Sequence, residues 1–140
     1  MVKIFLRFIL VVGLIPSLAN AGDIVGYYEA PPDFGGAINR FCVEKDPSGE
    51  FHVAIATAYC PSKECMNARI DGIQFRSKLK NHQIVSPPKS RCSLKIKFAK
   101  NGASIFKSKG ECGEDHPYLY AEGKYKFVSS EPDWSSCRLQ

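Results

Sequence analysis

Apolar and polar residues alternate with a period of two along most of this chain, and no long segment repeats its apolar residues at helical spacing. In residues 51–58, Phe51, Val53 and Ile55 occupy one face, while His52 and small residues occupy the other. Clusters of Gly, Pro and Asn interrupt the alternation at short intervals. This pattern predicts an all-β domain built from short antiparallel strands.

We expect about eight strands, joined by turns rich in Gly, Pro and Asn. Their predicted ranges are 24–29, 38–44, 51–58, 73–79, 82–85, two strands within 91–110, and 119–128. A sheet of this size closes into a small antiparallel β-barrel or sandwich, because closure removes the unpaired edges that invite aggregation.

The clearest hairpin lies within residues 91–110. Asn101-Gly102 favours a two-residue turn, which places Phe98 opposite Ile105. A single β-bulge in the returning strand then brings Cys92 opposite Cys112. The hairpin therefore predicts a disulfide between these two cysteines.

The first 21 residues have the three zones of a secretory signal peptide: a basic start, an apolar run over residues 8–15, and small residues at Ala19-Asn20-Ala21. Cleavage after Ala21 leaves one domain of residues 22–140. The apolar run is too short to remain as a membrane span, so we expect no membrane partner. The predicted location is periplasmic or secreted.

All six cysteines follow this segment, and an even number behind an export signal indicates disulfides. Cys60 and Cys65 are closest in sequence, and the short loop between them favours a second disulfide. Cys42 and Cys137 are then left as the third pair, in one of the fifteen arrangements that six cysteines allow. The hypothesis joins Cys92 with Cys112, Cys60 with Cys65, and Cys42 with Cys137.

Charge and ligand spacing exclude several classes of function. Residues 22–140 hold 17 basic and 14 acidic residues, a net charge of +3, and the lysines are scattered along the sequence. We therefore expect no nucleic-acid partner. The three histidines lie far apart and the cysteines lack zinc-type spacing, so we expect no metal and no cofactor.

Catalytic groups are also missing. Oxidised cysteines offer no thiolate, and no serine sits in a nucleophile-elbow setting. The acids of residues 111–115 are neighbours in sequence, whereas a glycosidase needs two carboxylates about 5 Å or more apart. We predict that the protein is not an enzyme.

Three loops are suited to binding a partner protein. Residues 31–36 place an aromatic side chain between prolines and glycines, residues 61–64 lie within a predicted disulfide loop, and residues 115–120 carry two tyrosines. The candidate partner-binding residues are Phe34, Lys63, Asp115 and Tyr118.

Short motifs at both ends resemble those of small bacterial periplasmic calycin-like β-barrel domains. Gly26-Tyr27-Tyr28 is similar to the G-x-W/Y opening of such barrels, and Cys112-Gly113 followed by Gly123-Lys124-Tyr125 resembles their ending. The chain departs from the lysozyme-inhibitor pattern because it lacks the serine-glycine-x-x-tyrosine loop.

Domains of this kind include lysozyme inhibitors and toxin-immunity proteins. The resemblance implies an exported binding protein that occludes the active site of a cell-wall-degrading enzyme, with Lys63 facing the catalytic carboxylates of that peptidoglycan hydrolase or toxin. Two alternatives remain: a lipocalin-like carrier of a small apolar ligand, and, third, a small secreted hydrolase.

Overall fold

The computed structural model describes residues 24–32, 38–87, 93–109 and 119–138. These residues form nine antiparallel strands and one short helix. The elements are β1 (Gly26–Glu29), β2 (Arg40–Lys45), β3 (Phe51–Tyr59), β4 (Arg69–Ser77), β5 (Leu79–Lys80), β6 (Gln83–Val85), β7 (Ser93–Ala99), β8 (Gly102–Lys109), β9 (Gly123–Ser129) and α1 (Trp134–Cys137). The all-β prediction is confirmed.

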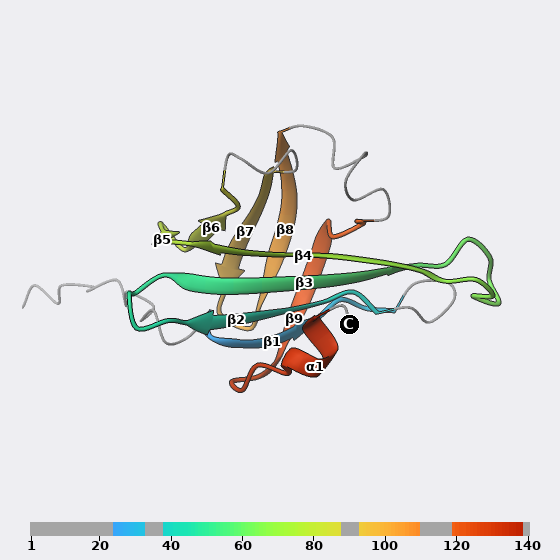
Figure 1. Cartoon of the computed structure of the whole chain (residues 1–140), viewed down its shortest axis with the longest axis horizontal. Helices are drawn as coiled ribbons and strands as arrows, with labels where there is room; N and C mark the ends of the chain where they lie inside the picture. Colours follow the sequence, from blue (N-terminus) through green and yellow to red (C-terminus); the bar gives the residue numbers. More distant parts are fainter. Residues whose placement is uncertain (1–23, 33–37, 88–92, 110–118, 139–140) are drawn as a thin grey trace, which may run out of the picture.

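The strands form one sheet in the order β4-β3-β2-β1-β9-β8-β7-β6-β5. β4 ends at Ser77 and β5 begins at Leu79, so the two ends of this order are consecutive in the chain. The sheet therefore curls into a nearly closed barrel. In Figure 1, β1 to β4 run across the front, and β6 to β8 cross behind them at a steep angle.

The alternation predicted for residues 51–58 is confirmed. Phe51, Val53 and Ile55 are at most 2% exposed and point into the barrel. At the centre, the ring of Tyr28 stacks on that of Phe41, with centroids 4.4 Å apart and planes 5° apart. Such contacts add to the free energy gained from burying the rings, so the interior is a packed aromatic and aliphatic core.

The β7–β8 hairpin differs from its predicted register. Phe98 lies opposite Ala103, Ala99 lies opposite Gly102, and the bulge falls beside Ser93. Gly102 is thus the first residue of β8 and not part of the turn. A Cβ atom at this position would lie 2.2 Å from the carbonyl oxygen of Tyr125. Close approach of β9, rather than the turn, requires this glycine.

Helix α1 covers the outer face of β1 to β3. Its Cys137 forms a disulfide with Cys42 of β2, and the two are buried with Tyr27 and Ala54. The Asp133 side chain caps the helix by accepting a hydrogen bond from the backbone N–H of Ser136. The sequence pattern did not predict this helix.

Two of the three predicted disulfides are present, Cys42–Cys137 and Cys60–Cys65. The Cys92–Cys112 pair lies outside the described residues and stays a prediction, although the register that motivated it is wrong. The signal peptide of residues 1–21 also lies outside them. Among the residues that the structure describes, no helix is long and apolar enough to cross a membrane.

Candidate functional site

The β3–β4 hairpin extends past the strands beside it. β3 pairs with β2 only as far as Ala56, which lies opposite Arg40. Beyond that point β3 pairs with β4 alone, from Thr57 opposite Asp71 to Tyr59 opposite Arg69. The tip of this hairpin projects at the right-hand end of the molecule in Figure 1. We call residues 59–70 the hairpin tip.

A disulfide closes the loop at the end of the hairpin tip. Cys60 and Cys65 are joined across five positions, and the backbone N–H of Cys65 donates a hydrogen bond to the Ser62 carbonyl at 3.0 Å. Cys65 and Asn67 adopt positive φ angles of 49° and 72°. Lys63 lies inside this short closed loop with its side chain exposed, so its position is restricted by the covalent ring.

Large apolar side chains are exposed around the hairpin tip. Met66 is 70% exposed and Ile70 is 64% exposed. Tyr59 stacks on Tyr120, with ring centroids 4.9 Å apart, and Tyr120 is 52% exposed. Tyr59 lies opposite Arg69 and Ile70 lies opposite Ala58, so the two side chains project from opposite faces of the hairpin. Exposed apolar and aromatic side chains are typical of protein-binding sites.

Asn39 fixes the segment that carries Tyr120. Its side-chain N–H donates a hydrogen bond to the Tyr120 carbonyl at 2.7 Å, and its side-chain oxygen accepts one from the Ala58 backbone at 3.0 Å. One amide therefore joins two chain segments at the base of the hairpin tip. The aromatic pair above it is held in place before any partner binds.

The predicted binding residues are only partly placed. Lys63 lies at the hairpin tip, whereas Phe34, Asp115 and Tyr118 lie outside the described residues. Sequence reasoning missed the exposed apolar residues around Lys63. The exposure of Ile70 could have been predicted from the strand alternation. Asp71 lies opposite Thr57, which is on the inward face of β3, so the preceding residue, Ile70, projects outward.

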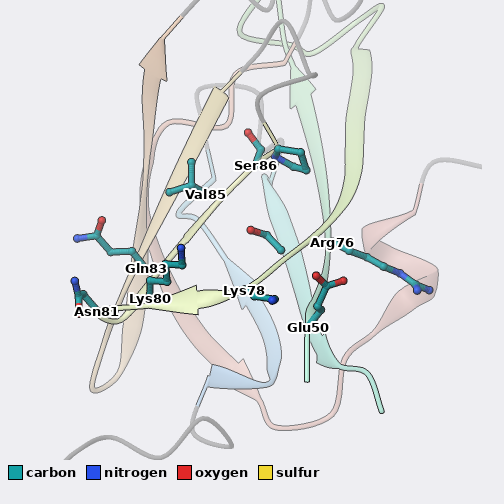
Figure 2. A pocket seen from close by; sticks show the side chains of 10 residues that line it. Glu50, Arg76, Lys78, Lys80, Asn81, Gln83, Val85 and Ser86 are labelled. Carbon is teal, nitrogen blue, oxygen red and sulfur yellow. The ribbon is translucent and has the colours of Figure 1, made fainter. Parts of the chain in front are cut away.

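A pocket of about 600 Å³ lies where β4 passes into β5. Figure 2 shows Arg76 and Glu50 on one side of it, with Lys80 and Gln83 on the other. Its charged groups are three cations and one carboxylate. It is lined by Glu50, Arg76, Ser77, Lys78, Lys80, Asn81, Gln83, Val85, Ser86 and Pro87.

One of the cations beside this pocket is already paired. Arg76 lies 3.8 Å from the carboxylate of Asp46. The pKa of Asp46 is lowered, first by the hydrogen bond from the Ser48 hydroxyl and only lastly by Arg76. The pocket's one carboxylate, that of Glu50, is accompanied by cations and by no histidine or second acid, so the pocket lacks an acid–base pair.

The two histidines that the structure describes lie in a ring stack and in a turn. His52 stacks on Trp134 with ring centroids 4.9 Å apart, and the Arg138 guanidinium lies 4.7 Å from the Trp134 ring centroid. His82 has a positive φ of 59° in the two-residue turn between β5 and β6. Neither histidine is placed as a catalytic base.

Metal and phenolate chemistry find no support among the described residues. No group of three or more His, Cys, Asp or Glu side chains there could hold a metal ion. Tyr27 donates a hydrogen bond to Glu29. Burial, and then that hydrogen bond, raise the pKa of Tyr27 to about 12, so the phenol stays protonated and acts as a donor.

Comparison with known proteins adds no relative: no family model, no curated protein and no solved structure matches this chain.

Proposed function

We propose that this chain is an exported binding protein that inhibits or neutralises a cell-wall-degrading enzyme by inserting its hairpin tip into the active site. The observation that carries the proposal is the disulfide-closed loop, which carries an exposed lysine, Lys63, on a hairpin tip that also exposes Tyr59, Met66 and Ile70. Such a loop loses little conformational freedom on binding, because its conformation is fixed beforehand.

The chemistry of the hairpin tip matches that of a glycan-cleaving active site. Such enzymes hold two carboxylates on either side of the scissile bond. The Lys63 ammonium would pair with these carboxylates, while Tyr59 and Ile70, on opposite faces of the hairpin, would contact the two walls of the cleft and keep water out. Excluding water strengthens an ion pair because the local dielectric constant falls.

The barrel interior supports external binding over the carrier alternative. Large side chains from opposite walls of the barrel fill it, and none of the six is more than 7% exposed: Phe51, Val53, Ile55, Leu94, Ile96 and Phe98. Small barrels are commonly packed in this way. Ligand contact is therefore assigned to loops and outer faces.

Export accounts for the disulfides. Disulfides persist in oxidising compartments, and the two in the described residues fit a protein of the periplasm or the extracellular space. The signal-peptide pattern of residues 1–21 supports the same location.

The proposal is tested by measuring complex formation between the purified protein and a panel of muramidases and peptidoglycan amidases. We expect a stable complex with at least one enzyme and loss of its activity. Lys63→Ala should weaken the complex by on the order of tenfold or more. Lys45→Ala is the matched control, since Lys45 is an exposed lysine near the other end of β3.

Two results would contradict the proposal. One is failure of the protein to bind any wall hydrolase in the panel. The other is equal binding by the Lys63→Ala and Lys45→Ala variants, which would remove Lys63 from the interface.

A further inference from the structure

Lysines are the only charged residues of the strands in one half of the barrel. β5 to β9 contain seven lysines and no aspartate, glutamate or arginine. In contrast, β1 to β4 contain residues of both signs. Strand pairing thus brings together the lysines of β5, β7 and β9, which are scattered in sequence, and the exposed ones, Lys80, Lys97, Lys124 and Lys126, suit an anionic partner.

Three of these lysines form a row across five strands. Lys80 lies opposite Gln83, Gln83 opposite Lys97, Lys97 opposite Ser104, and Ser104 opposite Lys124. Directly opposed residues of antiparallel strands project to the same face. The three lysines are exposed, and the next residues along β6 and β7 are buried, so the row lies on the outer face.

The row has a regular spacing. Its lysines stand on alternate strands, β5, β7 and β9, which are about 10 Å apart because neighbouring strands lie about 4.8 Å apart. Gln83 and Ser104 stand between them and offer an amide and a hydroxyl. No ion pair joins these lysines to a carboxylate within the described segments.

We propose that this row binds an anionic polysaccharide that carries one carboxylate, sulfate or phosphate group per disaccharide. The interval between lysines is close to the length of one disaccharide in an extended glycan. Each ammonium then meets one anionic group, while Gln83 and Ser104 form hydrogen bonds to hydroxyl groups of the sugar between them.

A neighbouring row supports a sugar ligand. Val85 lies opposite Lys95, and Lys95 lies opposite Phe106, which is 50% exposed. The exposed ring offers a flat apolar surface to the apolar face of a sugar ring. Lys95 adds a fourth cation beside it.

The same features disfavour two other anionic partners. Single-stranded nucleic acid is held by several aromatic side chains on which successive bases stack. Among the described residues of β5 to β9, two aromatic side chains are exposed, Phe106 at 50% and Phe127 at 38%. Phe127 lies opposite the buried Tyr28 and so belongs to the inward face, which leaves Phe106 alone beside the lysine row. A row one residue wide also fits a linear chain better than a planar lipid surface.

The test is titration of the purified protein with a hyaluronan octasaccharide, which carries one carboxylate per disaccharide, at low salt. We expect binding that weakens as salt is added. Lys97→Gln/Lys124→Gln should lower the affinity by on the order of tenfold. Lys45→Gln/Lys63→Gln removes the same charge elsewhere and should retain the affinity, which also separates this site from the hairpin tip.

A single-residue comparison tests the row itself. Lys124 and Lys126 lie on the same strand and both are exposed, but Lys126 lies opposite Gly102 and Glu29, outside the row. Lys124→Gln should weaken hyaluronan binding more than Lys126→Gln does. Equal effects would overturn the proposal, because they would indicate diffuse attraction.

Three further results would overturn it: equal affinity for neutral dextran, tighter binding to oligothymidylate, or tighter binding to vesicles containing phosphatidylglycerol.

Discussion

The rings of Tyr59 and Tyr120 stack with centroids 4.9 Å apart and planes 29° apart, although the two residues belong to distant segments of the chain. Asn39 holds the backbone of one residue of the pair against the strand that carries the other. The stack therefore links the hairpin tip to the barrel and gives it a preformed aromatic surface.

Tyr120→Ala should weaken the complex with a wall hydrolase by on the order of tenfold, because aromatic anchors dominate protein interfaces. The free energy of unfolding should change by less than about 1 kcal/mol, since Tyr120 is half exposed. Binding assays and urea unfolding measure the two quantities. Val128→Ala, at the same 52% exposure on β9, should leave the complex intact. A stable complex with Tyr120→Ala would exclude the stack from the interface.

The two disulfides should differ in their effect on stability. Cys42 and Cys137 are 95 positions apart, whereas Cys60 and Cys65 are 5 apart. Since the entropy removed from the unfolded chain grows with loop length, Cys42→Ala/Cys137→Ala should cost about 4.5 kcal/mol and Cys60→Ala/Cys65→Ala about 2 kcal/mol. Urea unfolding without reductant measures both. Equal losses would contradict the entropic account.

Stability should fall above pH 10 through the buried tyrosines. Tyr28 and Tyr125 each donate a hydrogen bond to the carbonyl of the residue four positions earlier, and burial raises the pKa of both phenols well above 10. The unfolded chain loses these protons first, so stability is complete below pH 10 and declines as the pH rises further.

Tyr125→Phe tests this linkage. Its free energy of unfolding should fall less steeply above pH 10, by up to about 1.4 kcal/mol per pH unit. Denaturant unfolding at pH 8, 10 and 11 measures the slopes. Parallel curves for the variant and the parent protein would show that Tyr125 does not contribute.

Gly102→Ala should destabilise the barrel by about 3 kcal/mol. Its Cβ would lie 2.2 Å from the backbone oxygen of Tyr125, which cannot move without displacing β9. Gly49→Ala is the control: its φ of +85° implies a cost of about 1 to 2 kcal/mol, and nothing lies within 4 Å of the added atom. Thermal unfolding ranks the two, and a smaller effect at Gly102 would contradict the close-approach argument.

The core could be predicted from the sequence because its signal is local. The alternation of Phe51, Val53 and Ile55 with small residues assigned the inward face of β3 correctly. The Asn101-Gly102 turn was placed wrongly, because a turn motif and a close backbone contact use the same residue type. Only the position of Tyr125 on the neighbouring strand distinguishes them.

The candidate sites could not be predicted from the sequence, because they depend on which strands pair and in which register. Lys80, Lys97 and Lys124 belong to three strands and become neighbours in a row only through the register of β5 to β9. Tyr120 likewise lies beside the hairpin tip through tertiary contacts with Tyr59 and Asn39. Helix α1 was missed because four residues are too short to show helical periodicity, although Asp133 carried a capping signal.

The position of the Cys42–Cys137 disulfide in the chain also determines when it can form relative to the other disulfide. Cys42 lies on the second strand, and Cys137 follows all nine strands of the described chain. In a polypeptide that is delivered N-terminus first, Cys42 cannot meet Cys137 until the last segment arrives, whereas Cys60 and Cys65 can meet early. Once the local pair has closed, Cys60 and Cys65 are no longer available as wrong partners for Cys42.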